Sequence, residues 1–204
     1  MSDAYRRLTR DQVAAAIERK NPPRVPMIRC KWWGEGLREQ YGSRLDELER
    51  YPEDCGWLWL DPIDYRAMNL PWDWEASGAH DSRVILDDWA QLDDFIERLP
   101  DPWTDSRFDE LVHLAEQYRA EDRYIMFGWW RLFFERPWAI RGMSSLMMDY
   151  YLEPDNVHRL HDALCNVYCG YIERVAAELH PDGFWTSDDL GHQTQLMMPP
   201  KVFR

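Results

Sequence analysis

Short, continuously apolar segments alternate along this chain with longer segments that have helical periodicity. The apolar segments are residues 24–30, 56–60, 124–130 and 184–186. Strands covered on both faces need no polar side, so this alternation predicts parallel β/α units. A complete (β/α)8 barrel has eight strands and typically about 250 residues. The chain is therefore predicted to form an α/β fold, an incomplete (β/α)8 TIM-type barrel with about four β/α units.

A doubly wound open sheet is the competing architecture. The chain has no GxGxxG after the first apolar segment and no Walker motif, and these are the phosphate-binding signatures of such sheets. The barrel is preferred for this reason.

Helical patterns fill the intervals between the apolar segments. Thr9 and Gln12 have the spacing of a capping box, which predicts a helix that ends near Lys20. Asp87 or Asp88 is expected to cap another. The remaining helices are expected near residues 35–41, 45–50, 107–120, 144–151 and 154–179 and from residue 199 onward. Residues 64–83 lack periodicity and are interpreted as an insertion.

Composition narrows the classes of partner and compartment. The formal net charge of −13 would repel a nucleic acid backbone. No apolar run approaches the roughly 20 residues of a membrane span, and the first ten residues are too polar for a secretory signal. The four cysteines are too sparse for a disulfide framework. We therefore expect a cytoplasmic protein with reduced thiols that binds neither nucleic acid nor membrane.

Twelve tryptophans provide more flat apolar surface than packing usually requires. They indicate a pocket for a large planar ligand, although aromatic side chains also fill many ordinary cores. Both interpretations stay open at this stage.

Charged and aromatic residues follow each predicted strand. In barrel enzymes the carboxyl ends of the strands meet at one mouth, where the chemistry takes place. The residues expected there are Arg29, Lys31, Asp61, Asp64, Trp129, Trp130, Arg131, Asp188, Asp189 and His192. Asp188 and Asp189 are adjacent, so one can point into the mouth while the other caps a helix or turn.

Residues 182–193, which read DGFWTSDDLGHQ, resemble the fourth strand and loop of the uroporphyrinogen decarboxylase superfamily. Residues 141–149 and 153–160 resemble the helices that precede this strand, and the PPRVP turn at 22–26 fits the amino-terminal segment. The resemblance implies that residues 1–204 form the amino-terminal part of a single barrel domain of this family, truncated at its carboxyl end.

The resemblance implies a lyase that decarboxylates carboxylated side chains of a tetrapyrrole, as in porphyrin biosynthesis, without a cofactor or metal. Arginines after the first strand would bind the substrate and an aspartate after the second would be catalytic. Arg29 and Asp61 match these roles. Asp188, Asp189 and His192 are further catalytic candidates, and Lys31, Asp64, Trp129, Trp130 and Arg131 complete the predicted substrate site.

Two alternatives remain. The superfamily also contains zinc-dependent methyltransferases that serve corrinoid proteins, and zinc is possible in the full-length protein if it is of that type. His161, Cys165 and Cys169 are spaced i, i+4 along one helix, as soft metal ligands could be, although cysteines there also suit apolar packing. The last alternative is a non-catalytic fragment, whose open sheet edges would favour a homodimer or aggregation.

Overall fold

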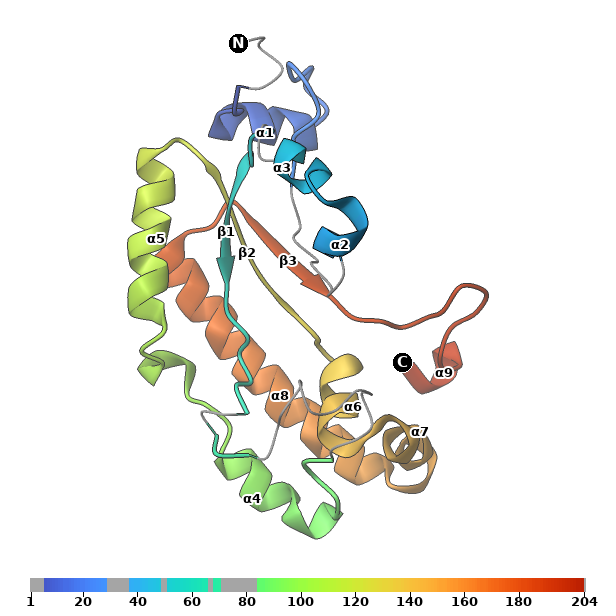
Figure 1. Cartoon of the computed structure of the whole chain (residues 1–204). Coiled ribbons are helices and arrows are strands. Elements are labelled where there is room, and N and C mark those ends of the chain that lie inside the picture. Colours follow the sequence, from blue (N-terminus) through green and yellow to red (C-terminus); the bar gives the residue numbers. More distant parts are fainter. Residues whose placement is uncertain (1–5, 29–36, 49–50, 66–67, 71–83, 204) are drawn as a thin grey trace. The chain divides into compact units, whose positions relative to one another are not determined.

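The computed structural model describes residues 6–28, 37–48, 51–65, 68–70 and 84–203 (Figure 1). It is a mixed α/β structure with an open, parallel sheet of three strands in the order β1-β2-β3. The strands are β1 (Cys55–Trp59), β2 (Tyr124–Trp130) and β3 (Gly183–Ser187). They correspond to three of the four predicted strands, and the parallel arrangement is confirmed. Closure into a barrel stays a prediction.

The predicted first strand is wrong for residues 24–28, which form no strand. These residues instead surround the buried side chain of Asp54, which lies just before β1. The Asp54 carboxylate accepts hydrogen bonds from the Met27 amide at 2.6 Å and from both terminal nitrogens of Arg24. Pro26 has no N–H to give to a ladder. Polar contacts with one carboxylate therefore take the place of strand pairing.

The helices follow the sequence patterns closely. Thr9 forms the predicted capping box with Gln12 at the start of α1 (Arg10–Ile17), and Asp88 caps the 3-10 turn η2 (Trp89–Gln91). The others are α2 (Leu37–Tyr41), α3 (Arg44–Leu48), α4 (Leu92–Glu97), η3 (Pro102–Thr104), α5 (Phe108–Ala120), α6 (Glu135–Arg141), α7 (Met143–Leu152), α8 (Pro154–Arg174), the π-helical turn η4 (Val175–Leu179) and α9 (Pro200–Phe203). Of these, α6 and the 3-10 turn η3 have no counterpart in the predicted pattern.

The chain divides into two compact units, and each strand contributes residues to both. The first consists of Met1–Leu58, Phe108–Phe127 and Leu179–Phe184, and the second of Trp59–Arg107, Gly128–Glu178 and Trp185–Arg204.

In the first unit, Leu8, Val13 and Cys55 form a buried cluster, and Trp57, Tyr124 and Met126 pack against it. Burial raises the pKa of the Cys55 thiol to about 11, with the nearby carboxylates acting in the same direction. This cysteine is therefore a packing residue rather than a nucleophile.

In the second unit, α8 supplies the main packing surface. Five of its apolar residues recur at helical spacing and are all buried: Val157, Leu160, Leu164, Tyr168 and Tyr171. Helix α8 packs against α4, α7 and η3. The Tyr168 ring also stacks on that of Trp129 in β2, with 5.6 Å between centroids, so α8 covers one face of the carboxyl-terminal half of this strand.

Candidate functional site

The carboxyl ends of the three strands lie side by side within the second unit. The Leu60 amide donates to the Gly128 carbonyl at 3.5 Å, and the Arg131 amide donates to the Ser187 carbonyl at 3.1 Å. Arg131 has a φ of 65°, so the chain turns sharply as it leaves β2. The residues that follow the three strands therefore lie together at the carboxyl end of the sheet.

Three tryptophans, one from each strand, form an aromatic cluster at the carboxyl end of the sheet. The rings of Trp59 and Trp130 are parallel within 4° at 6.1 Å between centroids. Trp185 meets both edge to face, at 5.3 Å from Trp59 and 4.4 Å from Trp130. Trp59 and Trp130 remain 39% and 36% exposed, and exposed aromatic surface of this kind suits stacking against a flat ligand. We call these three residues the tryptophan cluster.

Asp61 follows Trp59 by two residues and is fixed by a buried arginine. Arg136, on α6, is fully buried and donates from Nη2 to the Asp61 carboxylate. The same carboxylate accepts from the Ile63 amide at 3.0 Å. The Asp61 side chain is still 47% exposed, so one side of the carboxylate faces solvent while the other is held.

Two tyrosines complete the surroundings of Arg136. Its Nη1 lies 3.2 Å from the Tyr65 hydroxyl, and its guanidinium lies over the Tyr65 ring at 5.4 Å. Burial raises the pKa of Tyr65 and of Tyr168, although the Arg136 charge opposes this. Burial by itself would lower the pKa of Arg136. The interactions with Tyr65 and Asp61 outweigh burial, so the pKa of Arg136 is raised. Arg136 is therefore a permanent cation behind Asp61.

Asp188 connects the end of β3 to the start of α6. Its Oδ2 accepts from the amides of Phe133 and Phe134 at 2.8 and 2.7 Å, and its Oδ1 accepts from the amide of Glu135 at 2.8 Å. These are amides that a helix start leaves without partners. Of the two adjacent aspartates, Asp188 has the capping role that the sequence analysis left open for one of the pair.

Glu135 is a candidate that the sequence analysis missed. Burial raises the pKa of its carboxyl group, and the negative charges of Asp188 and Asp189 raise it further. The first residue of a helix is an unremarkable place for glutamate, so only the fold shows that two other carboxylates lie near it. A carboxyl group with a raised pKa is a candidate proton donor.

The remaining predicted residues occupy varied positions. Asp189 and His192 are exposed, and the His192 amide donates to Gln195 in a loop closed by a bridge between Gly191 and Leu196. Trp129 lies in the core at 1% exposed. Asp64 Oδ2 is 3.7 Å from Nη1 of Arg107, a cation that the sequence analysis did not single out.

Arg29 and Lys31 lie outside the described residues. Their predicted roles after the first strand are therefore not placed by the structure.

His161 is held by two backbone carbonyls. Its Nδ1 and Nε2 each lie 2.8 Å from an oxygen, those of Val157 and Phe133 respectively. Both ring nitrogens are occupied in this way, which leaves none for a metal. Cys165 and Cys169 are exposed on α8, and across the described ranges no three His, Cys, Asp or Glu side chains gather as metal ligands would.

Comparison with protein-family models, with curated proteins and with solved structures finds no match. The part of the chain that the structure describes contains no helix with the length and apolarity that a bilayer crossing needs.

Proposed function

We propose that this chain is part of a uroporphyrinogen decarboxylase-like lyase that removes carboxyl groups from a tetrapyrrole. The observation that carries the proposal is the position of Asp61, half-exposed and two residues beyond Trp59, where the chain leaves the carboxyl end of β1. The resemblance of residues 141–149, 153–160 and 182–193 to that family also supports the proposal. In this proposal the structure is the amino-terminal part of a (β/α)8 barrel.

The tryptophan cluster would bind the flat, apolar part of the substrate. Edge-to-face contacts with Trp185 hold the rings in place, and an exposed aromatic surface gains from stacking on another ring. Trp59 and Trp130 offer such surfaces from adjacent strands.

Asp61 would accept hydrogen bonds from pyrrole N–H groups and stabilise positive charge that develops on the ring. A fixed carboxylate does this well because it need not reorient when the charge appears. The hydrogen bonds from Arg136 and the Ile63 amide provide that fixation. Arg136 acts through Asp61 and is therefore a positioning residue.

Glu135 would supply a proton. Decarboxylation replaces a carboxylate by hydrogen, so each CO2 released requires one proton from a donor. The raised pKa of Glu135 keeps this carboxyl group protonated to a higher pH than an ordinary glutamate. Activity should therefore fall as the pH rises through the pKa of Glu135, and Glu135→Gln should remove that part of the pH profile.

The deciding experiment measures the conversion of uroporphyrinogen under anaerobic conditions. We expect Asp61→Asn to abolish conversion, whereas Asp94→Asn, an exposed aspartate on α4, should leave it unchanged. Quenching of tryptophan fluorescence by a porphyrin should weaken in Trp130→Leu but not in Trp103→Leu, a control on η3. Equal activity in both aspartate variants would contradict the proposal. Stoichiometric zinc with methyl transfer to a thiol would establish the methyltransferase alternative instead.

A further inference from the structure

A cavity of about 540 Å³ lies in the first unit, in the part of the chain around α1. Its described lining consists of Arg6, Arg7, Leu8, Thr9, Gln12, Pro23 and Arg24. Three of these seven residues are arginines, and no aspartate or glutamate is among them. Its described lining residues all belong to the first unit, and its volume is within the range of small-molecule sites.

Two of the arginines are fixed in place. Arg24 donates from both terminal nitrogens to the buried carboxylate of Asp54 and also to the Arg6 carbonyl at 2.8 Å. Arg7 donates from Nη1 to the Glu121 carboxylate at 3.1 Å and from Nη2 to the Glu121 carbonyl at 2.6 Å. Neither acidic partner is among the described lining residues.

Arg24 also has one donor atom that takes no part in these hydrogen bonds. Its Nε is buried and has no hydrogen-bond partner among the described residues. A buried donor without a partner costs the folded state free energy.

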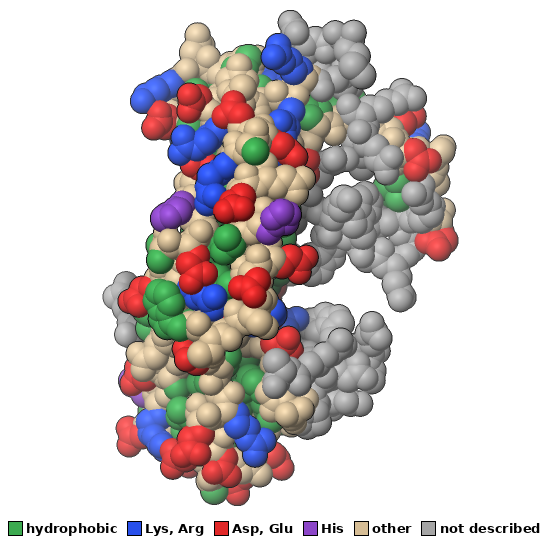
Figure 2. All heavy atoms as spheres, turned by 90° about the vertical axis from the view of Figure 1, so that its left-hand side faces the viewer, with side chains coloured by type: hydrophobic (Ala, Val, Ile, Leu, Met, Phe, Trp, Pro, Cys, Tyr) green, Lys and Arg blue, Asp and Glu red, His purple; other side chains and the backbone are tan. Residues whose placement is uncertain are grey.

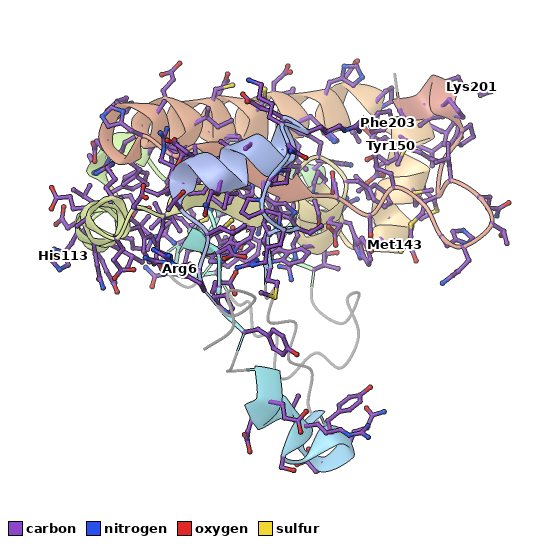
Figure 3. All side chains as sticks on the ribbon, turned by 90° about the horizontal axis from the view of Figure 1, so that it is seen from above. Arg6, His113, Met143, Tyr150, Lys201 and Phe203 are labelled. Atoms are coloured by element: carbon purple, nitrogen blue, oxygen red, sulfur yellow. The ribbon has the colours of Figure 1, made fainter. Side chains whose placement is uncertain are left out.

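Arg6 differs from the other two because its side chain is exposed. Its guanidinium forms no hydrogen bond or ion pair with the described residues, while its backbone is held by Arg24. Figure 3 shows Arg6 next to α1. The Arg6 side chain can therefore move to contact a ligand without breaking an existing hydrogen bond or ion pair, while its backbone stays held by Arg24.

Arginines also stand out here against the charge of the whole chain. The formal net charge is −13, and Figure 2 shows Lys and Arg side chains gathered among Asp and Glu where α1 and the end of α5 lie. Three arginines line one cavity of this acidic chain, and two of them also pair with Glu121 and Asp54. Arginine matches the oxygens of phosphate and carboxylate groups in a bidentate manner.

We propose that the cavity lined by Arg6, Arg7 and Arg24 binds a small oxyanion that carries at least two negative charges, such as a phosphate or polycarboxylate group. Arg7 and Arg24 form the fixed base of the site, and Arg6 provides the uncompensated charge. The site does not depend on the proposed decarboxylase activity.

The test is calorimetric titration with inorganic phosphate, pyrophosphate and citrate, at an ionic strength held constant with sodium chloride. We expect binding in the unaltered protein and in Arg19→Ala, a control that removes an exposed arginine elsewhere in the same unit. Arg6→Ala should bind about tenfold more weakly, because one charge-assisted interaction is lost. Arg6→Glu should abolish binding.

Thermal melts without ligand should be alike for the four proteins, because the Arg6 side chain makes no contact that supports the fold. Binding of phosphate and pyrophosphate without citrate would identify the ligand as a phosphate compound, and binding of all three would identify a general oxyanion site. Absence of binding in the unaltered protein, or equal binding in Arg6→Glu and Arg19→Ala, would overturn the proposal.

Discussion

Asp188 is a single side chain that holds the start of a helix. We expect Asp188→Ala to lower the free energy of unfolding by about 3 kcal/mol, because three backbone amides lose a charged acceptor at once. Urea denaturation monitored by circular dichroism measures the change. Asp189→Ala is the matched control, since this exposed neighbour should change stability little. Similar losses in both variants would mean that Asp188 has no special role.

Asp54 makes stability depend on pH in the acid range. Burial by itself would raise the pKa of this carboxyl group, but hydrogen bonds from Arg24 and from the amides of Leu8 and Met27 outweigh it and lower the pKa. A carboxyl with a lowered pKa stabilises the folded state above its unfolded pKa of about 3.9, and that contribution is lost as the pH falls through the folded pKa.

We therefore expect Asp54→Asn to be less stable than the unaltered protein at neutral pH and to depend less on pH below about 4. Urea midpoints measured across the acid range give the slope of stability against pH for the variant and for the unaltered protein. Arg24→Ala should reduce the slope as well, because the pKa of Asp54 would then rise toward that of the unfolded chain. An unchanged slope in both variants would show that the charge of Asp54 does not contribute.

At the scale of elements, close approach of two strands requires glycine at position 128. A Cβ atom added to Gly128 in β2 would lie 2.2 Å from the Trp185 carbonyl oxygen in β3, and this backbone atom cannot move without disturbing the sheet. We expect Gly128→Ala to destabilise the fold by about 3 kcal/mol, at the upper end of overpacking effects. Chemical denaturation measures the loss.

Gly56→Ala in β1 is the informative comparison for this prediction. Its added Cβ would meet the ring of Tyr118 at 2.4 Å. A side chain can rotate away where a backbone carbonyl cannot, so the loss should be smaller than for Gly128→Ala. A reversed order would mean that the ring is held more firmly than the strand.

The elements that the sequence predicted share one property: their signal is local. Residues 124–130 are apolar throughout, and α8 repeats its apolar positions at helical spacing, so burial follows from the pattern itself. The predictions failed where residues distant in the sequence determine the local conformation. Residues 24–28 look like a strand but are held by the Asp54 side chain. Helix α6 begins where Asp188, some fifty residues later, accepts its first amides.

The residues of the candidate site divide in the same way, into those with a local sequence signal and those without one. Asp61 and Trp130 could be found because they stand at the ends of apolar segments, where parallel strands bring side chains to one edge. Arg136 and Glu135 could not, because each owes its surroundings to contacts with Asp61 or with Asp188 and Asp189 that no local pattern contains.

At the scale of the whole molecule, the sheet leaves an edge that can pair. β1 and β3 are the two outer strands in the order β1-β2-β3, and the described residues add no further strand beside β3. An exposed edge presents backbone groups that another chain can bind. We therefore expect this protein to associate with itself as the concentration rises, through β3 of two copies.

Sedimentation velocity over a wide range of concentrations should show a monomer that becomes a homodimer. Ser187→Lys, which places a charge at the end of β3, should weaken the association, because an edge lysine must lose its hydration when a second strand pairs there. Gln193→Lys adds the same charge in the exposed loop that follows and should associate like the unaltered protein. A monomer at every concentration would contradict the prediction, and equal weakening in both variants would attribute association to net charge rather than to the edge of β3.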